Sequence, residues 1–194
     1  MQSKALNAGM AALLLSGAAQ ADWTLDAANS RFHYVTSKAA AISEVNSFGG
    51  LSGAIAGDGT ATLTIDLATV NTAIEIRDQR MRDIAFRVGE FPSADVSVKV
   101  DAAMLDAMAP GTLGEPQSYT ASVSLHGVTK DVAAELQIVK LDADTVLVQL
   151  AKPLLVAAGD FGLAEGVEEL RTIANLPSIN PQVVVDFSLV YDRQ

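Results

Sequence analysis

The sequence offers few side chains with the chemistry of catalysis. It contains two histidines, His33 and His126, and no cysteine, so thiolate nucleophiles, disulfides and zinc–thiolate sites are excluded. Ser30 lies close to His33, but the Gly-x-Ser-x-Gly turn that exposes a nucleophilic serine is missing. The histidines and carboxylates show no metal-ligand spacing. We therefore predict no catalytic residue, no metal and no cofactor.

A cluster of arginines is the other candidate for chemistry. Its members are Arg77, Arg80, Arg82 and Arg87. A guanidinium binds phosphate or carboxylate through parallel hydrogen bonds, so the cluster is suited to an anionic head group or membrane surface. Acidic residues are interleaved, however, and Asp78–Arg82 and Asp83–Arg87 have the i,i+4 spacing of helical ion pairs. A solvated helix face explains the same residues. Within the cluster, Arg77 is expected to organise the loop with Asp78.

The elements that position these residues are mostly strands. From Asp22 onward, apolar and β-branched residues alternate with polar ones, which is the pattern of half-buried strands. Eight strands are predicted in an antiparallel barrel or sandwich, separated by turn signals such as His126-Gly127. They cover residues 31–37, 50–56, 62–67, 96–100, 119–125, 132–138, 146–150 and 183–190.

Two stretches change to helical spacing. Residues 75–88 and 166–176 each place apolar side chains on one face, and Pro177 ends the second stretch. Residues 104–118 contain two Pro-Gly-rich turns and are predicted to be the longest loop. Gly49-Gly50 is expected to mark a bend or bulge in a strand.

Alternation along the strands also predicts which side chains face the interior. An eight-stranded barrel either fills its interior with these side chains or holds one small ligand, and the sequence leaves both alternatives open. The predicted inward set is apolar and is the candidate ligand-binding surface. It consists of Phe32, Tyr34, Leu63, Ile65, Val98, Val123, Leu136, Val148 and Phe187.

The N-terminus and the charge restrict location and partners. Residues 1–21 contain one basic residue, Lys4, then an apolar stretch and the small-residue ending Ala19-Gln20-Ala21. This layout is typical of a secretory signal peptide that is cleaved after Ala21, which predicts a periplasmic protein with one domain over residues 22–194. The formal net charge of −10 argues against nucleic acid as a partner.

Five motifs together resemble the YceI-like family of exported lipid-binding proteins. They are Trp23-Thr24-Leu25-Asp26; the run 48–53; Asn71-Thr72 with Arg77-Asp78 and Phe91-Pro92; the run 125–130; and Asp160-Phe161-Gly162-Leu163. The resemblance implies a lipocalin-like up-and-down barrel around an elongated apolar ligand, typically a polyisoprenoid, and implies no catalytic residues. The class is thus all-β, an eight-stranded antiparallel barrel with two short helices.

The resemblance favours an exported carrier of an isoprenoid-type lipid such as a quinone or polyprenyl species. Two alternatives belong to other classes of protein. One is a structural or stress-related module with a filled barrel, and the other is an enzyme acting on such a lipid, which would need a perturbed ionisable group inside the barrel. Transient membrane contact and a homodimer are further partner hypotheses.

Overall fold

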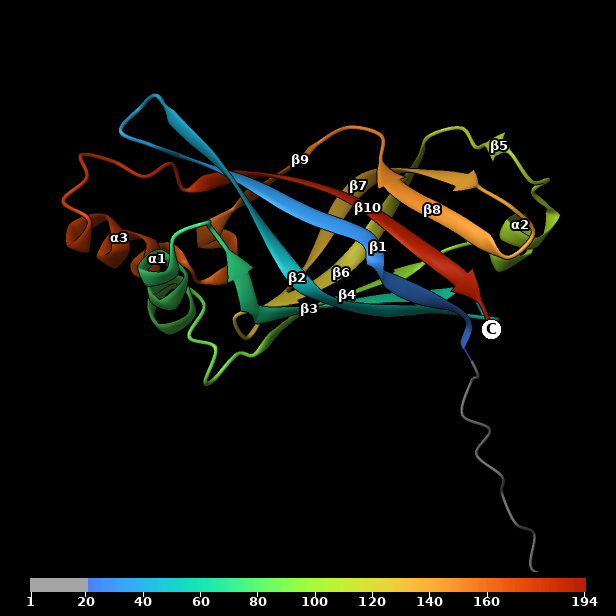
Figure 1. Cartoon of the computed structure of the whole chain (residues 1–194), viewed down its shortest axis with the longest axis horizontal. Helices are drawn as coiled ribbons and strands as arrows, with labels where there is room; N and C mark the ends of the chain where they lie inside the picture. The colour runs from blue at the N-terminus through green and yellow to red at the C-terminus, as the bar shows by residue number, and fades with distance from the viewer. Residues whose placement is uncertain (1–20) are drawn as a thin grey trace, which may run out of the picture.

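Eight antiparallel strands close into a barrel in the computed structural model, which describes residues 21–194 (Figure 1). The ring follows the order β1-β2-β3-β4-β6-β7-β8-β10, and β10 pairs back onto β1. The predicted barrel class is therefore confirmed. The strands of the ring are β1 (Ala21–Lys38), β2 (Ile42–Ala56), β3 (Thr60–Asn71), β4 (Ser93–Lys99), β6 (Gln117–Leu125), β7 (Val128–Lys140), β8 (Thr145–Leu150) and β10 (Gln182–Arg193).

Two shorter strands complete the sheet. β5 (Thr112–Leu113) pairs with the end of β7, and β9 (Leu154–Ala157) pairs with the first half of β10. β8 pairs with the second half of β10, so β8 and β9 occupy successive segments of one position in the wall. Pro153 lies at the interruption between them, where a residue without an N–H group removes no ladder hydrogen bond.

The helices lie at the two ends of the barrel rather than on its wall (Figure 1). At one end are α1 (Glu75–Arg80), which continues as a π-helical turn over Met81–Ala85, the 3-10 turn η2 (Ala158–Phe161), and α3 (Ala164–Ile173). At the other end α2 (Ala102–Ala107) lies beside β5. The two predicted helices are present, but the prediction of a loop over residues 104–118 is wrong in part. The Asp101 side chain caps α2 by accepting from the Met104 N–H at 3.1 Å.

Bulges let the long strands curve around the barrel. The register shifts between Asp26 and Arg31 of β1 and between Phe48 and Gly50 of β2. The predicted irregularity at Gly49-Gly50 is therefore confirmed. At Gly50 a Cβ atom would stand 2.8 Å from the Asp66 and Thr69 side chains, so only glycine lets the chain approach β3 this closely.

The predicted signal peptide falls almost wholly on residues 1–20, outside the part of the chain that the structure describes. Among residues 21–194, no helix has both the length and the hydropathy of a bilayer-spanning segment. The same residues contain no cluster of three His, Asp or Glu side chains arranged as metal ligands.

Candidate functional site

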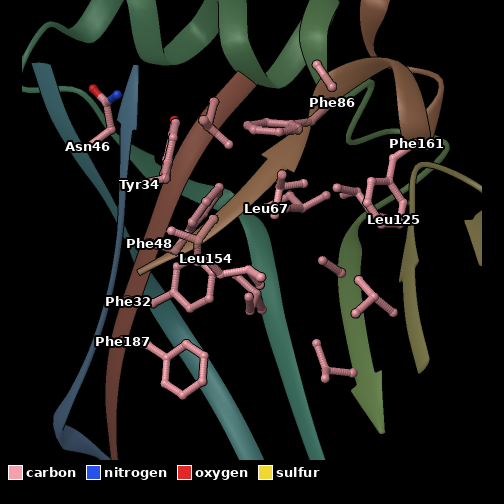
Figure 2. Close-up of a pocket in the computed structure, with 18 of the residues that line it drawn as sticks. Phe32, Tyr34, Asn46, Phe48, Leu67, Phe86, Leu125, Leu154, Phe161 and Phe187 are labelled. Atoms are coloured by element: carbon pink, nitrogen blue, oxygen red, sulfur yellow. The ribbon is translucent and has the colours of Figure 1, made fainter. Parts of the chain in front are cut away.

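A cavity of about 500 Å³ occupies the interior of the barrel (Figure 2). This volume lies within the range of about 300–1,000 Å³ that is usual for small-molecule sites. All nine side chains in the predicted inward set line this cavity, so strand alternation located its walls correctly.

The cavity has one aromatic wall. Phe32 and Tyr34 of β1, Phe48 of β2 and Phe187 of β10 all point inward (Figure 2). Their rings pack on one another, with centroids 6.2 Å apart for Phe32–Phe187 and 5.4 Å apart for Tyr34–Phe48. Phe86, just after the π-helical turn, extends this cluster with its centroid 5.7 Å from that of Phe48. Packing of this kind holds the rings in place, so they form a firm wall.

The opposite wall is built from small side chains. Ala94, Ala121 and Ala134 line the cavity from β4, β6 and β7. Val98 and Val123 also point inward on this wall, yet they are only half-buried, because the surface they leave uncovered faces the cavity. A barrel filled by its own side chains would bury such residues completely. The interior is therefore hollow, which decides between the two alternatives left open by the sequence.

The cavity is elongated along the barrel. On β10 the lining runs from Val183 to Tyr191, which corresponds to about 26 Å along the strand at about 3.3 Å per residue. Barrel strands tilt by about 35–45°, so the depth along the axis is about 20 Å. Leu105 of α2 lines one end, and Ile76 of α1 lines the other. The shape suits a chain rather than a compact ring system.

All of the charged lining residues lie at the end that carries α1, which we call the mouth. They are Lys38, Glu44, Arg77 and Arg80. Ile74 and Ile76 line the same end and are about half exposed, at 48% and 53%. The mouth is therefore both apolar and charged, whereas the remainder of the cavity is apolar apart from a few neutral polar groups.

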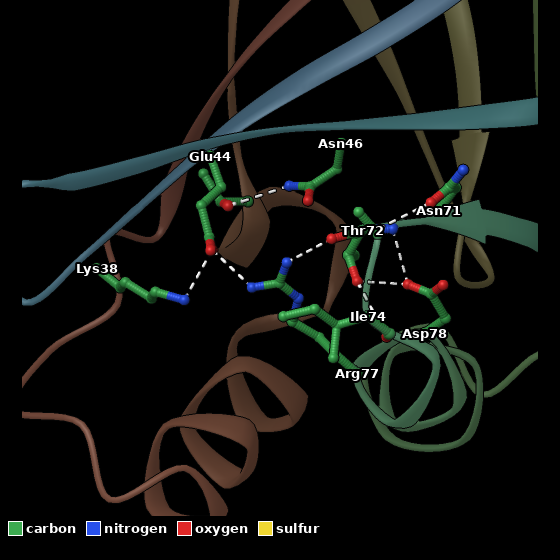
Figure 3. Close-up of polar contacts among 10 residues, drawn as sticks. Lys38, Glu44, Asn46, Asn71, Thr72, Ile74, Arg77 and Asp78 are labelled. Atoms are coloured by element: carbon green, nitrogen blue, oxygen red, sulfur yellow. Dashed lines mark hydrogen bonds and ion pairs between the residues drawn. The ribbon is translucent and has the colours of Figure 1, made fainter.

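An ion-pair network fixes one side of the mouth (Figure 3). Glu44 of β2 accepts from the Arg77 Nη1 and the Lys38 Nζ, each at 2.7 Å. Hydrogen bonds from Arg77 first, and then from Lys38, hold the pKa of the Glu44 carboxyl below its usual range. Arg77 also donates to the Thr72 carbonyl at 2.5 Å. The network therefore ties α1 to the β1–β2 hairpin and to the end of β3.

Asp78 completes this anchoring (Figure 3). It is buried, and its carboxylate accepts from the Thr72 N–H at 2.7 Å and from the Thr72 hydroxyl. The expected roles of Arg77 and Asp78 in organising the loop hold, although they act through Thr72 rather than through a direct bond. Neither predicted i,i+4 ion pair forms, because Asp78 is committed to Thr72 and Arg87 pairs with Glu90 at 2.5 Å.

The structure separates the four arginines of the predicted head-group cluster. Arg77 and Arg80 line the cavity, and Arg80 makes no ion pair within residues 21–194. Arg82 lies 3.6 Å from a Glu75 oxygen and does not line the cavity. Arg87 likewise lies outside the lining, with its backbone in the left-handed region at φ 49°. Arg87 lies beyond the π-helical turn, which ends at Ala85, so the four arginines do not form one cluster on a helix face.

Two neutral groups add polarity close to the mouth. The Tyr34 hydroxyl is buried and has no hydrogen-bond partner among the described residues. Burial raises the pKa of Tyr34, so the hydroxyl stays protonated and is available as a donor. Asn46 of β2 also lines the cavity, and its amide donates to the Thr36 hydroxyl at 3.1 Å. An acceptor near the mouth could pair with the Tyr34 donor.

The histidines lie outside the cavity lining. His33 is half-buried on the outer face of β1, and its Nδ1 atom has no partner among the described residues. His126 occupies the predicted hairpin turn with φ 52°, and its ring packs against Phe91 at 4.4 Å between centroids. Neither residue reaches the interior.

A model of the YceI-like domain matches residues 23–191, nearly the whole described chain. The chain belongs to the YceI-like family. The resemblance based on the sequence motifs is thereby confirmed. No curated protein sequence matches the chain.

Solved structures agree with this assignment. A polyisoprenoid binding domain from Saccharophagus degradans, implicated in plant cell wall breakdown, has 38% sequence identity and a TM-score of 0.88, over 90% of this chain and 100% of that one. Burkholderia cenocepacia BcnA shares the fold at 19% identity and a TM-score of 0.66, covering 86% of this chain and 98% of that one. The Campylobacter jejuni YceI protein does so at 18% identity and a TM-score of 0.55, over 77% and 84% of the two chains.

The geometry explains what one YceI-like motif does in this chain. Asn71 accepts from the Ala73 N–H at 2.8 Å, and this turn directs the chain out of β3 and into α1. The Thr72 carbonyl then accepts a hydrogen bond from Arg77, and the Thr72 N–H donates one to Asp78. The motif therefore places α1 at the mouth, and its charges serve mainly as anchors.

Several lining residues escaped the sequence analysis. Phe48, Glu44 and Asn46 precede the predicted strand 50–56, whereas β2 begins at Ile42. The alternation of Glu44, Asn46 and Phe48 was the available signal, but two glycines hid its continuity with the rest of the strand. Leu105 was placed in a loop, and only tertiary packing brings it to the cavity.

We predict that Asp78→Ala destabilises the protein by about 1–3 kcal/mol, because it leaves the buried Thr72 N–H and hydroxyl without an acceptor. Asp83→Ala is the matched control, since Asp83 is exposed on the same helical segment and should change stability by less than about 0.5 kcal/mol. Urea unfolding measures both. Equal changes in the free energy of unfolding would show that the bonds from Thr72 to Asp78 do not stabilise the protein.

Proposed function

We propose that this protein is an exported, non-catalytic carrier that holds an isoprenoid-type lipid, a quinone or polyprenyl species, inside the barrel. The observation that carries the proposal is the hollow, elongated and apolar interior with its charges confined to the mouth. The name of the Saccharophagus degradans relative, a polyisoprenoid binding domain, supports the same ligand class. The predicted signal peptide supports a periplasmic location for this carrier.

Apolar contact alone supplies enough affinity. Burying about ten ligand carbons at about 0.8 kcal/mol each yields about 8 kcal/mol before ordering costs, which corresponds to roughly micromolar binding. The firm aromatic wall reduces the ordering cost on the protein side, because Phe32, Phe48 and Phe187 are already packed on one another. A carrier must also release its ligand, so moderate affinity suits this role.

The alternatives explain fewer observations. A structural module needs no cavity of about 500 Å³, and an enzyme would need an ionisable group poised inside it. The titratable lining residues are the four charged side chains at the mouth and three tyrosines, Tyr34, Tyr119 and Tyr191, whose pKa values burial raises. Tyrosines shifted in this direction are poor proton acceptors near neutral pH.

The mouth is suited to the ligand's polar end and to brief contact with a membrane. Among the described cations that line the mouth, Arg80 is the one without an ion pair, and the half-exposed Ile74 and Ile76 line the same end. Apolar side chains around an opening bury surface when they touch a bilayer, which shortens the path of a lipid into the cavity.

A homodimer stays a prediction that sedimentation analysis tests.

The cavity gives the sharpest test of the carrier. Val123→Phe places a ring in free space, so we expect little loss of stability and about tenfold weaker binding of geranylgeraniol, because the ring displaces about two ligand carbons. Ser122→Phe is the control, since Ser122 is exposed on the outer face of β6 and should leave binding unchanged. Isothermal titration and thermal unfolding supply the two measurements.

The opposite pattern would contradict the carrier. If Val123→Phe lost about 1–3 kcal/mol of stability, the ring would be overpacking a filled core. Solvent extraction of the freshly purified protein, followed by mass spectrometry, adds an independent test in which an isoprenoid-type lipid is expected. Absence of such a lipid, together with no binding of added geranylgeraniol, overturns the proposal.

Arg80 is the test position for head-group binding, and Arg87 is its control. Arg80→Ala should weaken binding of geranylgeranyl phosphate about tenfold, the value of one hydrogen bond to a charged group, and leave geranylgeraniol unaffected. Arg87→Ala should change neither affinity, because Arg87 lies outside the cavity and pairs with Glu90. If both variants bound geranylgeranyl phosphate with equal affinity, Arg80 would have no role in binding the head group.

Export has its own measurement. Intact-mass analysis of the protein from a periplasmic extract should show a chain that begins at Asp22, because cleavage is expected after Ala21. Recovery of only the full-length chain, and only from the cytoplasm, would contradict a periplasmic location.

A further inference from the structure

The end of the barrel opposite the mouth is closed by a separate element. α2 connects β4 with the β5–β6 segment and lies across this end (Figure 1). Of α2 and β5, only Leu105 lines the cavity, and its side chain is 0% exposed. Leu105 is therefore the one side chain from these two elements that closes the end of the cavity, while the strands form its sides.

Two contacts hold α2 in position, and a third holds its partner Arg193. Asp101 caps its first turn, with 3.1 Å between Oδ1 and the Met104 N. Asp106 pairs with Arg193 at the end of β10. Arg193 in turn lies over the Trp23 ring of β1, 4.4 Å from its centroid. This helix of only six residues is thus tied to the two strands whose pairing closes the barrel.

Rigid placement of Leu105 has a consequence for an elongated ligand. A chain that enters at the mouth meets the Leu105 side chain after about 20 Å, the depth estimated from strand rise and tilt. Carbons beyond that depth stay outside the mouth and add little affinity. We propose that Leu105 is a specificity-determining residue that sets how long an isoprenoid chain the barrel accommodates. This inference rests on the proposed function and adds the chain-length class of the ligand.

The physical basis is the size of the side chain at this position. Leu105→Ala removes about three carbon atoms from the closed end, and Leu105→Val removes about one. Each ligand methylene that enters the vacated space strengthens binding roughly fourfold. A longer chain gains from the extra depth, whereas a chain too short to reach Leu105 gains nothing.

The test is a competition among three isoprenoid alcohols of increasing length: farnesol, geranylgeraniol and solanesol. Equimolar amounts are added to the full-length mature protein, and native mass spectrometry measures the ratio of bound species. For Leu105→Ala we expect the ratio of bound solanesol to bound farnesol to rise about 60-fold, because about three further ligand carbons enter at about fourfold each. Leu105→Val should give a smaller rise in the same direction, and it keeps the test valid if the alanine variant does not fold.

Leu113→Ala is the matched control. It makes the same substitution at the same end of the molecule, but Leu113 of β5 is 62% exposed and lies outside the cavity lining. Its binding ratio should equal that of the unmodified protein. If the Leu105 variants gave this same ratio, the role of Leu105 would be overturned while the carrier function stood. If the unmodified protein bound none of the three alcohols, the carrier function itself would fail.

Discussion

The pairing of β1 with β10 is the interaction on which the rest of the structure depends. It runs from Trp23–Arg193 to Val35–Val184 and converts a sheet with two open edges into a closed wall. A closed wall can enclose apolar space that water does not fill favourably, because the strand ladders run around the whole ring and leave no open sheet edge facing the interior. Without this closure, Phe32 and Phe187 would not meet, and the aromatic wall would be lost.

A hollow interior lowers packing density, so the molecule needs stabilisation elsewhere. The anchoring contacts are concentrated at the two ends of the barrel. At the mouth, Glu44, Arg77 and Asp78 hold β2, β3 and α1 together through Thr72. At the closed end, Trp23 is buried beneath two cations, Lys140 and Arg193, at 4.3 and 4.4 Å from its ring centroid. Polar anchors at the ends leave the middle free for a ligand.

This division also explains why conspicuous charged motifs are not the binding surface. Arg77 and Asp78 stand out in the sequence, yet the hydrogen bonds that they form join Thr72 and Glu44 within the protein. The lining is formed instead by ordinary residues such as Ala121, Val123 and Ala134, whose small volume matters more than their chemistry. A binding site that depends on shape is hard to recognise from residue types, because the sequence does not distinguish a valine that faces a cavity from a valine in a filled core.

The sequence by itself determined the strand pattern, the inward set and the family. Period-two alternation is local information, so Leu63, Val98 and Phe187 could be assigned to the interior before any strand was paired. The volume of the cavity and the bonding partner of each polar side chain depend instead on residues that lie far apart in the chain. Only the tertiary structure decided that the barrel is hollow, that Asp78 binds Thr72 rather than Arg82, and that Leu105 closes one end. Each of these outcomes is fixed by which side chains meet across the barrel, and no local pattern contains that information.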